Sequence, residues 1–196
     1  MAVPELNDRY WDQRYLTDAT GWDVGEISEP IKVYVNQLEK KDIAILIPGC
    51  GNAYEAIFLL DNGFSNITLI DISPLLVNSL KEKLKQYIGK ELEIICGDFF
   101  THQGKYDLII EQTFFCALDP MHRSDYAIKM NELLNQSGKL VGLLFDRSFV
   151  GGPPFGGSEE EFRKLFSKHY HLRTMEQCYN SIEPRKGSEL FIILEK

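Results

Sequence analysis

The chain has 196 residues, of which 44% are hydrophobic and 26% are charged, a composition typical of one globular domain that buries about 70% of its unfolded surface. Its formal net charge of −8 argues against a nucleic-acid backbone or an anionic membrane as the main partner, because both require clustered lysine and arginine. Its longest apolar runs, near 43–47 and 140–145, are shorter than the ~20 residues that a membrane helix needs.

Cysteine usage and the amino terminus indicate a cytoplasmic protein. The first eight residues contain neither a basic region nor an apolar region, so no secretion signal is visible. The four cysteines form no Cys-x-x-Cys pair and no cluster with histidine: Cys50, Cys96, Cys116 and Cys178. We therefore predict reduced thiols, and no metal site, since His169-x-His171 lacks an evident third ligand. We also expect a monomer.

Apolar runs of four to eight residues alternate with segments of helical periodicity from residue 43 onward. The seven predicted strands are 43–47, 67–72, 92–96, 106–110, 139–145, 171–178 and 189–194. The middle runs are continuously apolar, as strands covered on both faces must be. This order predicts an α/β fold with a doubly wound, seven-stranded, mostly parallel sheet over residues 43–196.

Capping residues mark the predicted helix ends. Ser73-Pro74 and Asp119-Pro120 each have an N-cap residue followed by proline at the first helical position. Ser158 with Glu161 forms a capping box, and Gly138 stands where a helix C-terminal glycine is expected.

Residues 1–42 differ from the core because they contain both tryptophans, Trp11 and Trp22, together with Tyr15 and a predicted helix over 28–38. An aromatic-rich helical segment before the first strand is suited to be a lid over the carboxyl ends of the strands. The alternative is that these rings only pack a helix against the sheet.

A glycine turn follows the first strand, and an acid ends the second. The turn contains Gly49 and Gly51, and Asp71 lies 20 residues after Gly51. Glycines let backbone approach a ligand closely, and a carboxylate at the tip of the next strand accepts hydrogen bonds from ribose hydroxyls. The arrangement predicts a site for a nucleoside-containing cofactor.

The turn favours S-adenosylmethionine over a dinucleotide. Tyr54 stands where the dinucleotide fingerprint has its third glycine. That glycine permits close packing of helix and strand beside a pyrophosphate, so a tyrosine there weakens the case for NAD. The sequence has no Tyr-x-x-x-Lys pair, as a short-chain dehydrogenase would, and no Gly-Lys-Ser/Thr phosphate loop. An NAD-linked oxidoreductase remains the disfavoured alternative.

Several longer motifs resemble those of the thiopurine methyltransferase family. Within that family, the sequence is most similar to the halide/thiol methyltransferases of plants. They extend over nearly the whole chain: Tyr10-Trp-Asp-Gln-Arg-Tyr15, Gly21-Trp-Asp-Val-Gly25, Pro48-Gly-Cys-Gly51, Asp71-Ile-Ser73, Gly97-Asp-Phe-Phe-Thr101, Phe114-Phe-Cys-Ala117, Gly151-Gly-Pro-Pro-Phe155 and Pro184-Arg-Lys-Gly187. The resemblance implies a Rossmann-like fold and S-adenosylmethionine as cofactor.

The resemblance also implies roles for individual residues. Those implied to contact the cofactor are Trp11, Tyr15, Trp22, Gly49, Gly51, Asp71, Asp98, Phe99, Glu111 and Gln112. In this set Asp71 holds the ribose, Asp98 and Phe99 flank the adenine, and Trp22 faces the transferable methyl group. Those implied to contact the substrate are Trp22, Phe115, Phe155 and Arg185.

One position leaves the acceptor open. Glu111-Gln112 stands where the resemblance expects Asp-Arg in thiopurine enzymes and Asp-Tyr in plant enzymes. No acid–base pair is evident near the predicted site, which suits methylation of a small soft nucleophile that arrives ionised: a thiolate, a thiopurine-like compound, or a halide-like anion. The alternative function is a non-catalytic module that senses the cofactor or scaffolds a partner.

Overall fold

The computed structural model describes residues 5–196. Residues 1–4 lie outside the described residues. They include the first residues of the predicted lid segment and part of the amino terminus in which no secretion signal was visible. Within the described residues, no helix combines the length and the apolar character that crossing a bilayer requires.

Seven strands form one sheet in the order β3-β2-β1-β4-β5-β7-β6. Their bounds are β1 Ile45–Pro48, β2 Ile67–Asp71, β3 Leu92–Cys96, β4 Tyr106–Gln112, β5 Leu134–Phe145, β6 His171–Gln177 and β7 Glu189–Glu195. The strands β1 to β5 pair in parallel, whereas β7 runs antiparallel to both of its neighbours. All seven predicted strands and the mostly parallel sheet are confirmed.

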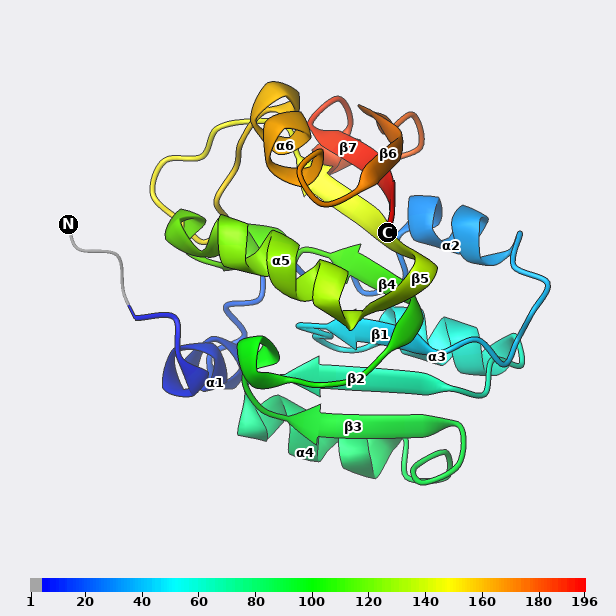
Figure 1. Ribbon diagram of the computed structural model, residues 1–196. Helices are drawn as coiled ribbons and strands as arrows, with labels where there is room; N and C mark the ends of the chain where they lie inside the picture. Colours follow the sequence, from blue (N-terminus) through cyan, green and yellow to red (C-terminus); the bar gives the residue numbers. More distant parts are fainter. Residues whose placement is uncertain (1–4) are drawn as a thin grey trace.

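Helices cover both faces of the sheet, as Figure 1 shows with α5 in front and α3 and α4 behind. The helices are α1 Asp8–Leu16, α2 Glu29–Val35, α3 Tyr54–Asp61, α4 Pro74–Lys83, α5 Arg123–Leu133 and α6 Glu159–Phe166. Four short 3-10 helices join them: η1 Phe99–Thr101, η2 Phe115–Ala117, η3 Pro120–His122 and η4 Glu183–Arg185. The predicted helix over 28–38 is confirmed as the shorter α2.

Strand alternation gives the sheet two hydrophobic cores. Ile45 and Ile47 of β1 point into the core shared with α2, α3 and α4, and Leu46 points into the core shared with α5 and α6. Since both faces are buried, the strands need apolar residues at every position. The fold is therefore doubly wound around the sheet.

The capping predictions are confirmed in part. Ser73 Oγ accepts a hydrogen bond from the Leu76 N–H at 3.1 Å and begins α4. Ser158 Oγ likewise accepts from the Glu161 N–H at 3.3 Å, but the Glu161 carboxylate pairs with Arg123 instead of completing the capping box.

The prediction for Gly138 is wrong. This glycine lies within β5 rather than at a helix end. A Cβ on Gly138 would lie 2.9 Å from the Asn135 carbonyl oxygen and 3.0 Å from that of Tyr106, so the residue is small because backbone approaches it. Helix α5 ends at Leu133 and β5 begins at the next residue.

Candidate active site

A cavity of about 1000 Å³ opens at the carboxyl edge of the parallel strands. Helix α1 lies beside the arrowheads of β2 and β3 (Figure 1) and contributes one wall. Ten of the predicted site residues line the cavity: Trp11, Tyr15, Trp22, Gly49, Gly51, Asp71, Asp98, Phe99, Gln112 and Arg185. Residues from six separate segments thus converge at one place.

The loop after β1 requires glycine at two positions. Gly49 has φ +56° and Gly51 has φ +50°, a left-handed conformation that side chains disfavour. A Cβ on Gly49 would lie 2.3 Å from Cδ2 of Phe114, which is shorter than the van der Waals contact distance, so the two atoms would clash. The backbone of this loop is consequently exposed to the cavity without intervening side chains.

The carboxylate of Asp71 ends β2 and faces the glycine loop. Its Oδ1 accepts from the Ser73 N–H at 3.0 Å, and its Oδ2 accepts from the Gly51 N–H at 3.4 Å. Burial raises the pKa of Asp71, and the N–H donors of Ser73 and Gly51 oppose that rise. A buried carboxylate with few donors retains capacity to accept hydrogen bonds from a ligand.

Asp98 and Phe99 follow β3 at the next position along the edge. The Oδ1 of Asp98 accepts from the Phe100 N–H at 2.9 Å and begins η1. The ring of Phe99 is buried and meets the ring of Phe114 edge to face, with centroids 5.2 Å apart. This end of the cavity is therefore an apolar slot with one carboxylate at its mouth.

Three rings from residues 11–22 form an aromatic wall. Trp22 meets Trp11 and Tyr15 edge to face, with centroid distances of 5.6 and 5.9 Å. Burial raises the pKa of the Tyr15 phenol, and the neighbouring Asp71 raises it further. The phenol stays protonated and can donate a hydrogen bond.

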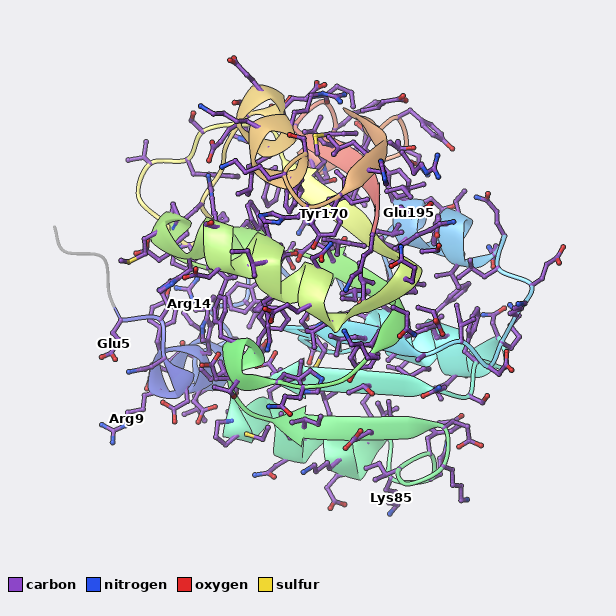
Figure 2. The ribbon with its side chains drawn as sticks, in the orientation of Figure 1. Glu5, Arg9, Arg14, Lys85, Tyr170 and Glu195 are labelled. Carbon is purple, nitrogen blue, oxygen red and sulfur yellow. The ribbon has the colours of Figure 1, made fainter. Side chains whose placement is uncertain are left out.

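Arg14 lines the cavity beside the aromatic wall, and Figure 2 labels its side chain above α1. Its guanidinium lies 5.5 Å from the ring centroid of Trp22. Its Nε is buried and has no hydrogen-bond partner among residues 5–196. Sequence reasoning missed this residue, although helical spacing places it on one face with Trp11 and Tyr15.

Polar contacts attach the aromatic segment to the core. Asp12 Oδ1 accepts hydrogen bonds from the Ser73 hydroxyl and, at 3.2 Å, from the Leu75 N–H at the start of α4. Asp23 accepts from the side chain of Asn52 and, at 3.3 Å, from the Tyr54 hydroxyl. The segment is thereby anchored both to the residues that follow the glycine loop and to the start of α4.

Glu55 adds a second buried carboxyl group to this region. It lies on α3 and lines the cavity. Burial raises its pKa from 4.5 to about 7, and Asp23 contributes to the rise.

The ends of β4 and β5, with the loops that follow them, form the other half of the cavity, which we call the acceptor half. At the strand ends and in the loop after β5 it is lined by Gln112, Thr113, Phe145, Arg147, Phe149, Pro153 and Pro154. The loop after β4 adds Phe114, Cys116, Ala117, Leu118, Asp119, Met121 and His122, and η4 adds Arg185. The set is mostly apolar and cationic, and its carboxylate and histidine are Asp119 and His122. Arg147 supplies positive charge to this half, whereas the charge of Arg185 is balanced by Glu189.

The guanidinium of Arg185 is already engaged by protein atoms. Its Nη2 donates to the Trp22 carbonyl at 2.7 Å, and its Nη1 donates to Glu189 Oε1 at 3.4 Å. Arg185 thus fastens the aromatic segment to η4 while it lines the cavity.

Three predicted site residues do not line the cavity. Glu111 is fully buried behind it, and its carboxylate accepts from the N–H groups of Phe114 and Phe115. Phe115 packs in the core against Tyr126 and Phe162, and Phe114 lines the cavity in its place.

Phe155 is the third, and it lies over Gly152. Its N–H donates to the Cys116 carbonyl at 2.7 Å, and the neighbouring Pro153 and Pro154 line the cavity instead.

Among residues 5–196, no group of three or more His, Cys, Asp or Glu side chains is arranged to hold a metal ion. The four cysteines are free, and Cys50, Cys116 and Cys178 are buried.

The fold is shared with solved methyltransferase structures. Magnesium protoporphyrin IX methyltransferase from Synechocystis, with bound SAM, matches with a TM-score of 0.76 and 14% identity over 100% of this chain and 99% of that chain. A Burkholderia thailandensis N1-methyltransferase that acts on 1,6-didemethyltoxoflavin matches with a TM-score of 0.72 and 15% identity over 100% and 93%. At these identities the likeness shows the fold alone.

Sequence relatives are more specific. A probable thiol methyltransferase of Arabidopsis thaliana is 31% identical over 186 residues, which cover 91% of this chain and 81% of the relative. Thiopurine S-methyltransferase of Pseudomonas fluorescens is 26% identical over 191 residues, covering 87% of each chain. The family model for thiopurine S-methyltransferase (TPMT) matches residues 6–193, and the chain therefore belongs to the thiopurine S-methyltransferase family.

Proposed function

We propose that the protein transfers the methyl group of S-adenosylmethionine to a small soft nucleophile: a thiol or thiolate, or a halide-like anion. The observation that carries the proposal is the hydrogen bond between Asp71 and the Gly51 N–H at the edge of the cavity. It brings together a ribose-binding type of carboxylate and a glycine loop. Membership of a methyltransferase family supports an enzyme over a non-catalytic sensor.

The residues of the cavity fit this cofactor. S-adenosylmethionine has an adenosine but no phosphates, and Tyr54 begins α3 where a dinucleotide site has its third glycine. The orphaned Nε of Arg14 suits an anionic group such as an amino-acid carboxylate. A Cβ on Gly97 would meet no heavy atom within 4 Å, so the cavity is open at the end of β3.

The proposed roles follow the order of the strands. In doubly wound sheets a ligand lies outside the carboxyl ends of the strands, across the point where the strand order reverses. Asp71 on β2 would bind the ribose, and Asp98 with Phe99 after β3 would flank the adenine. The loop after β1 would accommodate the methionine portion, with Trp11 and Tyr15 covering it.

The acceptor half explains why a soft nucleophile is favoured. When bound, S-adenosylmethionine supplies an electrophilic methyl group on a sulfonium. Trp22, Phe145 and Phe149 exclude water from the approach, which removes the hydration shell of an incoming anion. Arg147 supplies positive potential. In the acceptor half only Asp119 and His122, both in the loop after β4, could accept a proton. An acceptor that is already ionised needs neither of them for in-line displacement.

Methyl transfer from radiolabelled S-adenosylmethionine tests the proposal, with iodide, bromide, bisulfide and an aromatic thiolate as separate acceptors. We expect methylated product from at least one of them, and none with Asp71→Ala at low cofactor concentration. A protein that binds the cofactor in a calorimetric titration, yet methylates none of these acceptors, would refute the soft-nucleophile proposal. Tighter binding of NAD than of S-adenosylhomocysteine would refute the cofactor.

We further propose that the protein acts in the cytoplasm as a monomer without a nucleic-acid partner. The net charge of −8 supports the last point. Size-exclusion chromatography with light scattering tests the monomer, for which a mass near 22.5 kDa is expected.

A further inference from the structure

Arg123 is a buried arginine that lies outside the cavity. It is the first residue of α5, is only 8% exposed and is not among the residues that line the cavity. Burying a charged group costs free energy unless the group is paired and all of its donors are satisfied. The Nε of Arg123 is buried and has no hydrogen-bond partner among residues 5–196. Stability alone is therefore a poor explanation for an arginine at this position.

Three segments of the chain meet at the guanidinium of Arg123. Its Nη1 donates to Glu161 of α6, and its Nη2 donates to the Gly156 carbonyl at 2.7 Å. The guanidinium carbon lies 5.1 Å from the ring centroid of Phe115 in η2 and 5.7 Å from that of Phe162 in α6. A guanidinium is a rigid plane that can donate along its edge while its faces contact rings. One side chain thus joins the loop after β4, the loop after β5 and helix α6.

Gly156 closes the base of the loop after β5, which Figure 1 shows in yellow between β5 and α6, beside the start of α5. A Cβ on Gly156 would lie 1.7 Å from the Arg147 carbonyl oxygen, so the two ends of the loop touch backbone to backbone. The adjacent Phe155 N–H donates to the Cys116 carbonyl at 2.7 Å. The returning arm of the loop is therefore attached at two consecutive residues, and Arg123 provides one of the two attachments.

The loop between these ends forms part of the acceptor half. Arg147, Phe149, Pro153 and Pro154 line the cavity. In the part of the chain that the structure describes, positions 148–154 make no hydrogen bond to the rest of the protein. The position of the cavity-lining side chains consequently depends on how firmly the base of the loop is held.

We propose that Arg123 is a positioning residue, which holds the loop after β5 against the loop after β4 and so sets the affinity for the methyl acceptor without contacting it. A misplacement of about 1 Å can cost on the order of 100-fold in rate even when the change is remote from the reacting atoms. For its effect on the acceptor this inference rests on the proposed function, whereas the attachment of the loop can be measured without methyl transfer.

Limited digestion with trypsin tests the attachment, because Arg147 at the base of the loop is exposed. A protease cleaves a folded protein where a segment opens locally. Arg123→Met keeps an unbranched side chain but removes every donor, and we expect cleavage after Arg147 to become about tenfold faster. Arg123→Lys keeps the charge but replaces the planar group with a single ammonium, so we expect an intermediate rate. Mass spectrometry of the fragment that ends at Arg147 measures the rate.

Steady-state kinetics tests the effect on the acceptor, with thiophenol and iodide as separate acceptors at saturating S-adenosylmethionine. We expect the KM for the acceptor to rise about tenfold in Arg123→Met. Affinity for S-adenosylhomocysteine, measured by calorimetric titration, should stay unchanged, because the predicted cofactor residues Gly51, Asp71 and Asp98 follow strands that Arg123 does not contact.

Arg163→Met is the matched control. Arg163 also donates to a glutamate, Glu159, and to a main-chain carbonyl, that of Met175, each at 2.6 Å. It lies on α6 and does not line the cavity. The variant should lower the midpoint of thermal unfolding but leave the cleavage after Arg147 and the acceptor KM unchanged. The comparison separates a loss of stability from a loss of position.

The inference requires both changes, and the absence of either one in Arg123→Met would overturn it. Changes of equal size in Arg163→Met would overturn it as well, since stability would then account for them. If Arg123→Met does not fold, Arg123→Lys is judged by the same two measurements. If the wild type methylates no acceptor, the proposed function fails, whereas cleavage at the wild-type rate would refute the attachment independently of any methyl transfer.

Discussion

The carboxylate of Asp71 accepts a 3.4 Å hydrogen bond from the backbone N–H of Gly51, 20 residues earlier in the chain. The contact joins the ends of β1 and β2, which pair in parallel with Pro48 opposite Ile70. Register and spacing therefore fix the distance between the glycine loop and the acid. The same position buries the carboxylate of Asp71, and burial raises its pKa because it disfavours the ionised form.

Replacement of Asp71 should change cofactor binding and stability in opposite directions. We expect Asp71→Asn to weaken binding of S-adenosylhomocysteine by about 1–3 kcal/mol, because the hydroxyls of the ribose lose an ionised acceptor. Asparagine can keep the 3.0 Å hydrogen bond from Ser73 through its carbonyl oxygen and loses only the longer one from Gly51. Because it also removes a buried charge, the free energy of unfolding without cofactor should rise. Calorimetric titration and urea unfolding measure the two effects, and a loss of both affinity and stability would contradict this account.

Gly49→Ala should destabilise the protein strongly. The substitution places a side chain at φ +56° and 2.3 Å from Cδ2 of the Phe114 ring. We expect a loss of about 3 kcal/mol or more, from backbone strain and overpacking together. Gly21→Ala is the matched control, since a Cβ on Gly21 meets nothing within 4 Å and its φ is ordinary. Equal midpoints of thermal unfolding for the two variants would refute the prediction.

The sheet could be predicted because both of its faces are buried. Strands such as 92–96 need apolar residues throughout, and this run is bounded in the structure as it is in the sequence. β5 is the exception, since its first five residues include Asn135, Gln136 and Ser137. In this stretch only Leu134 pairs with β4, opposite Tyr106, and the regular ladder begins at Lys139 after an irregularity in the register. Local sequence does not predict such an irregular start of a strand.

Site residues could be predicted where the ends of strands determine their positions. They were harder to predict where the conformation of a turn decides which side chain faces the cavity. Asp71 and the glycines follow from strand ends. The choice between Phe114 and Phe115 depends on the turn that Glu111 imposes through two hydrogen bonds, and no periodicity encodes such a turn. Phe155 was misplaced for a similar reason, because its backbone is fixed by Cys116, 39 residues away in sequence.

Asp12 should control how firmly α1 closes over the cavity. Its Oδ1 accepts from the Leu75 N–H and the Ser73 hydroxyl, so it acts as a helix cap supplied by another helix. In Asp12→Ala we expect faster hydrogen exchange of the α1 amides and faster cofactor release, with exchange in α5 unchanged. Gln13→Ala, on an exposed residue of the same helix with no side-chain hydrogen bond among those described, serves as the control. Identical exchange of α1 in both variants would show that the contact does not hold the helix.

Glu111 should make the stability of the protein depend on pH. Burial raises its pKa from 4.5 to about 7, against the opposing effect of the Tyr126 hydroxyl and two N–H donors. Since the folded state holds this proton up to a higher pH than the unfolded state does, the contribution to stability is complete below pH ~4.5 and is lost as the pH rises through about 7. The full effect is on the order of 3 kcal/mol.

Glu111→Gln isolates this effect, because glutamine cannot ionise but can still accept from the Phe114 and Phe115 N–H groups. The free energy of unfolding of the variant minus that of the wild type should therefore grow between pH 5 and pH 8. Urea unfolding at several pH values measures it, and Glu55 and Asp71 titrate in both proteins and cancel to first order. Tyr126→Phe removes the hydroxyl that donates to Glu111 Oε2, which raises the carboxyl pKa further and should move the pH dependence upward. A difference between variant and wild type that is constant with pH would mean that Glu111 keeps the same protonation state in the folded and unfolded chains.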